Sequence, residues 1–157
     1  MSSQATTQLD NLLDRLAAFE PTTFPVISLY LNTQPDQHGR ANFEPFVRKE
    51  FAARAKTYPA GSPELASFER DTERINQYLA EKLRPSANGL AIFACAGEGE
   101  FFEAVQLDAP VQEHRLFVNN QPHLYPLAHI YDQYRRYAAL IADTNSARLF
   151  VFGFGKR

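Results

Sequence analysis

The feature that most constrains the fold is a short, almost wholly apolar stretch at residues 24–31 (FPVISLYL). It is rich in β-branched and aromatic residues, which favour strands over helices. A strand without a polar face is typical of a position inside a sheet that is covered on both sides. The sequence therefore predicts a buried strand here, in a sheet with helices packed on it.

Four other segments show the apolar spacing of amphipathic helices, and we expect helices at about 9–19, 43–55, 63–83 and 125–136. The second carries the stripe Phe43, Val47 and Phe51, and Asn42 is predicted to cap it. Ser62, followed by Pro63, is a good start for the third, because serine caps a helix and proline fits its first turn.

From Asn88 onward the period changes to two, which predicts strands at 90–95, 101–107 and 114–118 and a terminal hairpin at 137–143 and 147–152. One early strand followed by three consecutive ones indicates an α+β fold. We expect a mixed or antiparallel sheet of about four strands, packed with four helices, plus the C-terminal β-hairpin.

An isolated two-stranded hairpin is only marginally stable in water. We therefore interpret residues 1–136 as one α+β domain and residues 137–157 as the first hairpin of a second, truncated domain. The predicted boundary lies near Arg135 and Arg136, after the fourth helix.

Composition excludes several classes of protein. With 45% hydrophobic and 22% charged residues the chain is globular, and its net charge of −2 gives no overall attraction to nucleic acid. Cys95 is the only cysteine, which excludes an intrachain disulfide and fits a reducing compartment. The first residues lack the apolar segment of a signal peptide, and no apolar run approaches the roughly 20 residues that span a bilayer. We expect a cytoplasmic protein without a membrane partner.

No constellation of catalytic or metal-ligating residues is recognisable. Ser28 and Cys95 lie in predicted buried strands, without a nucleophile-elbow pattern. The four histidines lack the spacing of metal ligands on one helix. We predict no catalytic residue, metal or cofactor, and no enzymatic activity in this chain.

The third helix interleaves acidic and basic residues. This pattern favours a solvated face with pairs three or four residues apart over an acid/base site. The residues are Glu64, Glu69, Asp71, Glu73 and Glu81, with Arg70, Arg74 and Lys82.

One local basic patch is a candidate for phosphate binding. Lys49 and Lys56 are seven residues apart and so share a helix face, away from the phenylalanine stripe. An ordinary solvated helix face is the alternative. The five candidate cations are Arg40, Arg48, Lys49, Arg54 and Lys56.

Three stretches occur together in order: 26–31 (VISLYL), 83–93 (LRPSANGLAIF) and 116–127 (LFVNNQPHLYPL), the last running on to 137–143 (YAALIAD) and 147–150 (ARLF). Together they resemble the N-terminal domain of archaeo-eukaryotic class I peptide-chain release factors and the start of the domain that follows it. The P-H-L-x-P-L and A-R-L-F variants look most like the bacterial release-factor-like proteins.

The resemblance implies a ribosome-associated role. In that family the first domain reads the stop codon, and a Gly-Gly-Gln loop in the second helps water attack the peptidyl-tRNA ester. The chain departs from the family's motifs. It has no Asn-Ile-Lys-Ser in the corresponding region 55–70, no Tyr-x-Cys-x-x-x-Phe around 116–120, and no Gly-Gly-Gln.

Two functional hypotheses follow. The first is a non-catalytic domain of a translation termination or ribosome-rescue protein that contacts the ribosome or tRNA through the five cations. The second is a protein-interaction or self-association module, possible because an apolar strand edge favours pairing, here with a partner or a second copy. The predicted edge comprises Leu149, Phe150, Val151 and Phe152.

Overall fold

The computed structural model describes residues 2–133, 137–142, 144 and 146–152, with backbone alone at 2–8, 137–139 and 150–152. In chain order the elements are α1 (Ser2–Ala17), β1 (Val26–Asn32), α2 (Glu44–Ala55), α3 (Pro63–Glu81), β2 (Gly89–Cys95), β3 (Phe101–Leu107), β4 (Arg115–Asn119), α4 (Tyr125–Gln133), β5 (Tyr137–Ala142) and β6 (Ala147–Phe152).

Strands β1 to β4 form a sheet in the order β3-β2-β1-β4, and every neighbouring pair is antiparallel. Leu29 of β1 lies opposite Ile92 of β2 on one side and Leu116 of β4 on the other. The predicted α+β class is confirmed, and the sheet is antiparallel rather than mixed. The strand predicted at 24–31 is an interior strand, buried along almost its whole length.

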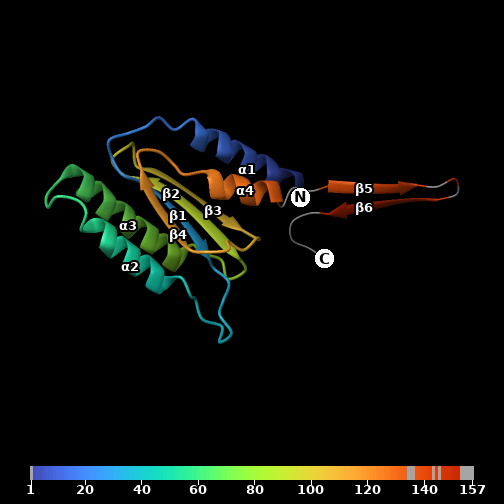
Figure 1. Ribbon diagram of the computed structural model, residues 1–157, viewed down its shortest axis with the longest axis horizontal. Helices are drawn as coiled ribbons and strands as arrows, with labels where there is room; N and C mark the ends of the chain where they lie inside the picture. The colour runs from blue at the N-terminus through green and yellow to red at the C-terminus, as the bar shows by residue number, and fades with distance from the viewer. Residues whose placement is uncertain (1, 134–136, 143, 145, 153–157) are drawn as a thin grey trace.

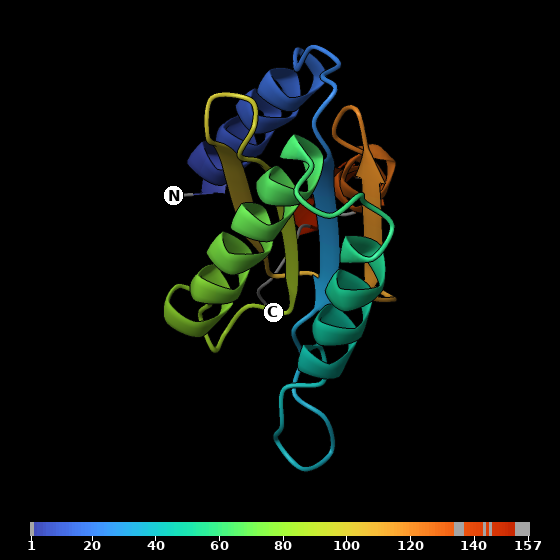
Figure 2. The same cartoon turned by 90° about the vertical axis from the view of Figure 1, so that its left-hand side faces the viewer.

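Helices cover both faces of this sheet (Figure 1). Alternate residues of β1 point to opposite faces, as strand geometry requires, so Leu29 and Tyr30 belong to different cores. Figure 2 looks onto the layer of α2 and α3, whose Phe51 and Phe68 pack edge to face in the core beneath. On the opposite face, α1 contributes Leu16 to the second core and α4 contributes Leu127.

The starts of α2 and α3 differ. Ser62 accepts a hydrogen bond from the backbone N–H of Leu65, so the predicted cap of α3 is confirmed. The predicted cap of α2 is wrong: the capping position is Phe43, one residue after Asn42, and no side chain closes this end. Burial of Phe43 in the core, where it is 5% exposed, holds the start of α2 instead.

Strands β5 and β6 pair with each other in a two-stranded antiparallel sheet of their own, drawn apart from the four-stranded sheet in Figure 1. The predicted hairpin is therefore confirmed. The predicted boundary at residue 136 lies outside the described residues, and the division into two domains stays a prediction. Among the described residues, no helix is both long and apolar enough to cross a membrane.

Candidate nucleic-acid interface

The predicted phosphate-contacting residues lie on the loop before α2, on α2 and at its end. Arg40, Arg48, Lys49 and Lys56 are exposed, whereas Arg54 is half-buried. Within the part of the chain that the structure describes, none of the five forms an ion pair. Their charge is therefore not neutralised by a neighbouring carboxylate.

Helix geometry explains why Arg54 differs from the other four. Val47 and Phe51 define the buried side of α2, and at 100° per residue Arg54 lies on that same side. Lys49 and Lys56 lie on the opposite side, as the sequence predicted. Arg54 instead acts on Tyr58. Burial raises the pKa of the Tyr58 hydroxyl, the positive charge of Arg54 lowers it, and the negative charge of Glu64 raises it.

The loop that carries Arg40 is held in one conformation by Asp36. Its Oδ1 accepts hydrogen bonds from the backbone N–H groups of His38 and Arg40, both at 2.8 Å. Gly39 has a φ of 73°, which glycine adopts without steric cost. Figure 2 shows the loop between β1 and α2 extending beyond the end of the sheet, and Arg40 on this loop is exposed.

A shallow hollow of about 170 Å³ lies where the α2–α3 connection meets the ends of β1 and β4. It is lined by residues of both regions that the resemblance assigns to codon reading, Tyr58 from one and Asn119 from the other. Glu64 adds a carboxylate, which the sequence did not indicate as part of a site. The lining residues are Thr22, Thr23, Phe24, Pro25, Tyr58, Glu64, Val118, Asn119 and Asn120.

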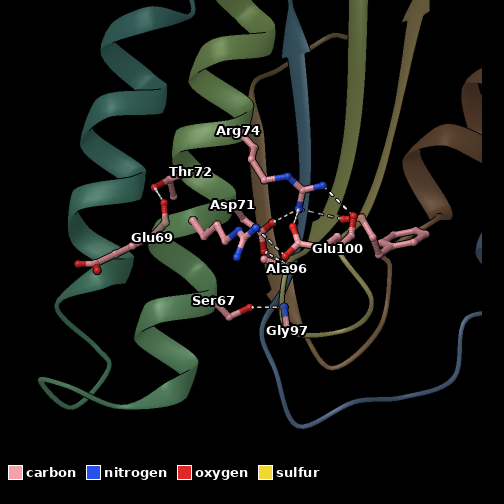
Figure 3. A network of polar contacts seen from close by, with 10 residues as sticks. Ser67, Glu69, Asp71, Thr72, Arg74, Ala96, Gly97 and Glu100 are labelled. Carbon is pink, nitrogen blue, oxygen red and sulfur yellow. Dashed lines mark hydrogen bonds and ion pairs between the residues drawn. The ribbon is translucent and has the colours of Figure 1, made fainter.

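Asp71 corrects the expectation of a wholly solvated face on α3, because its side chain is fully buried. Its Oδ2 accepts from the backbone N–H of Ala96 at 2.8 Å, and its Oδ1 pairs with Arg74 at 3.0 Å (Figure 3). Burial raises the pKa of the Asp71 carboxyl to about 6, against the lowering effects of the Ala96 hydrogen bond and the Arg74 charge. The signal was in the spacing: Asp71 is three residues after Phe68 and four before Ile75, on the buried stripe.

Three other residues considered for chemistry are buried or bonded within the fold. Ser28 and Cys95 are buried as predicted, and the Ser28 hydroxyl accepts a hydrogen bond from the backbone N–H of His123. His114 accepts one from the backbone N–H of Asn32, and burial lowers the pKa of its imidazole. The described residues contain no group of three His, Cys, Asp or Glu placed to hold a metal ion.

The predicted interaction edge is described only in part. Leu149 is 64% exposed and lies opposite Leu140, which is 66% exposed, so one face of the hairpin presents two leucines to solvent. The side chains of Phe150, Val151 and Phe152 lie outside the described residues.

Comparison with known proteins identifies the fold and no closer relationship. No family model and no curated protein matches the chain. Similar solved structures include one titled only as an archaeal protein (TM-score 0.62, 14% identity) and that of the archaeal translation termination factor aRF1 (TM-score 0.57, 13% identity). Each match covers 94% of this chain and 41% of the other.

The chain has a release-factor-like fold. It spans about two fifths of the length of either neighbour. At this level of identity the likeness concerns the fold alone.

Proposed function

We propose that this chain is a non-catalytic domain of a release-factor-like translation protein and that it contacts ribosomal RNA or tRNA. The observation that carries the proposal is the fold likeness to an archaeal translation termination factor over 94% of the chain. The sequence resemblance to bacterial release-factor-like proteins supports the same assignment, because its three motifs occupy β1, the α3–β2 connection with β2, and β4 with α4.

The surface that suits RNA best is formed by Arg40, Arg48, Lys49 and Lys56. These side chains are exposed and unpaired within the described chain, so binding to phosphate would break no ion pair of the protein. Each cation that neutralises a phosphate releases a counterion, which makes binding weaken as salt rises. Arg54 belongs to the proposed set with a smaller role, because its half-buried side chain lies near Tyr58.

The proposed function includes neither codon recognition nor hydrolysis. The hollow beside Tyr58 lies where the resemblance would place codon reading, but the chain lacks both motifs that carry that reading in the family. The 157-residue sequence contains no Gly-Gly-Gln. Hydrolysis of peptidyl-tRNA would need groups other than these.

The proposal is tested by measuring binding to purified ribosomes and to tRNA as a function of salt. The triple variant Arg48→Gln, Lys49→Gln, Lys56→Gln should bind more weakly, and the slope of log K against log salt should fall by about two to three. The control removes three exposed cations elsewhere, of which Arg115 differs from the tested set in forming an ion pair with Glu113: Lys82→Gln, Arg115→Gln, Arg148→Gln. Equal losses in both triple variants would show non-specific attraction, and unchanged binding at low salt with all five candidates neutralised would refute the surface.

The second candidate function is protein interaction through the hairpin. Leu140, Ile141 and Leu149 are each more than 60% exposed, and large exposed apolar side chains are typical of surfaces that bind another protein. Sedimentation of the chain with and without residues 137–157 tests self-association. Monomers in both cases would exclude self-pairing through this hairpin.

A further inference from the structure

Arg40 is the one candidate phosphate contact whose position does not follow from a helix. It lies in the connection between β1 and α2, which extends beyond the end of the sheet (Figure 2). The backbone of such a connection has many conformations unless hydrogen bonds select one of them. Arg40 therefore needs a separate structural reason to stay in one place. The other four candidates lie on α2 or at its C-cap: Arg48, Lys49, Arg54 and Lys56.

The turn at residues 36–40 is closed by four hydrogen bonds among its own residues, and Asp36 takes part in all of them. Its side-chain Oδ1 accepts from the backbone N–H groups of His38 and Arg40. Its backbone N–H donates to the carbonyl oxygen of Arg40 at 2.9 Å, and its own carbonyl oxygen accepts from the N–H of Gly39 at 2.9 Å. The backbone of Arg40 is thus bonded to Asp36 through both its N–H and its C=O group.

This turn is anchored to nothing else in the described part of the chain. The two ends of the connection are held separately: Thr33 donates from its hydroxyl to the carbonyl oxygen of Ala87 at 2.7 Å, and Phe43 is buried in the core. Residues 36–40 are all exposed, and among the described residues no hydrogen bond or ion pair joins them to another segment. The bonds of Asp36 therefore determine the shape of this loop and add nothing to the core.

The charge of Asp36 opposes the function that we propose for the neighbouring cations, because a carboxylate repels phosphate. Its hydrogen bonds act in the opposite direction. We propose that Asp36 is a positioning residue for RNA binding, which closes the turn 36–40 and so holds Arg40 ready to contact a phosphate. Arg40 then binds without the entropy loss of ordering a mobile loop. This inference rests on the proposed function of the chain, and it assigns the benefit to the acceptor Oδ1 alone.

Two variants of equal charge separate the acceptor from the charge. Asp36→Asn keeps a side-chain oxygen that can accept both bonds, since asparagine forms the same kind of turn, whereas Asp36→Ala has no acceptor. Binding to purified ribosomes and to tRNA is measured at low salt. Asp36→Asn should bind at least as tightly as the wild type. Asp36→Ala should bind about five- to tenfold more weakly than Asp36→Asn, which corresponds to the entropy of ordering roughly one residue.

A double-mutant cycle tests whether Asp36 acts through Arg40. In the Arg40→Gln background the difference between Asp36→Ala and Asp36→Asn should largely disappear, because no cation remains to be positioned. Equal binding of the two Asp36 variants with Arg40 present would overturn the proposal. A difference that persists in full without Arg40 would overturn it as well, since Asp36 would then affect RNA binding by another route.

NMR of the free chain gives a readout that does not depend on RNA. The backbone N–H groups of His38 and Arg40 should exchange with water faster in Asp36→Ala than in Asp36→Asn, while the urea midpoints of the two variants should agree. Unchanged exchange in Asp36→Ala would show that the carboxylate does not hold the turn and would refute the positioning role.

The same measurements distinguish this inference from the proposed function. Absence of any salt-dependent binding by the wild type refutes both. If the wild type binds and the triple variant at Arg48, Lys49 and Lys56 binds more weakly, the proposed surface is supported. Equal binding of Asp36→Ala and Asp36→Asn in that case refutes the role of Asp36 alone.

Discussion

Strands β1 and β5 are both short and apolar, yet their leucines differ in burial. Leu29 on β1 is completely buried, between two strands and under α2 and α3, whereas Leu140 on β5 is 66% exposed. The apolar composition that predicts a strand does not determine whether that strand is covered, because burial also requires neighbouring strands and a helical layer. The comparison separates residues whose apolar character stabilises this fold from residues whose apolar character is available for another contact.

A matched pair of leucine truncations tests that difference most strongly. Leu29→Ala should lower the free energy of unfolding by about 2–5 kcal/mol, since it removes buried apolar atoms and leaves a cavity between tightly packed neighbours. Leu140→Ala should change it by less than about 0.5 kcal/mol, as exposed sites usually do. Urea unfolding followed by circular dichroism measures both, and similar losses in the two variants would show that β5 is covered in solution.

The next largest effect concerns a buried charge within the α3 layer. The folded pKa of Asp71 is raised above its unfolded value, so the folded chain binds more protons than the unfolded one between about pH 4 and pH 6. The stabilisation this gives is complete below about pH 4 and is lost as the pH rises through 6, a change of up to about 3 kcal/mol. The free energy of unfolding of Asp71→Asn, minus that of the wild type, should therefore rise by that amount between pH 4 and pH 7.

Urea unfolding at several pH values measures this gain. The control is Asp108→Asn, which changes an exposed carboxylate after β3, and its curve should run parallel to that of the wild type. A constant difference between wild type and Asp71→Asn at all pH values would mean that burial does not shift the Asp71 titration.

The two helix starts under the same face give a smaller, local contrast. Ser62→Ala should cost about 1 kcal/mol, because the backbone N–H of Leu65 loses its acceptor. Asn42→Ala should have almost no effect, since the start of α2 has no side-chain cap. Thermal unfolding of both variants checks this, and an equal cost for Asn42→Ala would restore that residue as a cap.

Periodicity predicted the elements of the body because local pattern and final burial agree there. The stretch at 24–31 has no polar face, and the structure gives it none to expose. Periodicity failed at Asp71, which is a titratable residue on the buried stripe of α3. Its carboxylate can be buried there because it accepts a hydrogen bond from the backbone N–H of Ala96, 25 residues away in the sequence. The spacing of Lys49 and Lys56 predicted their shared face. That Tyr58 and Asn119 line the same hollow could not be predicted, because it depends on how the α2–α3 connection packs against the sheet.

The smallest expected effect is also the most direct test of the boundary between the two regions. Deleting residues 137–157 removes a hairpin whose described apolar side chains, Leu140, Ile141 and Leu149, are largely exposed, so these three contribute little buried apolar surface. The free energy of unfolding of the remaining residues should change by less than about 0.5 kcal/mol, the range usual for sites outside a core. Amide exchange of β1 and β2 should also keep its protection. A loss of several kcal/mol would instead show that the hairpin packs on the body, and residues 1–136 would no longer count as a domain that folds on its own.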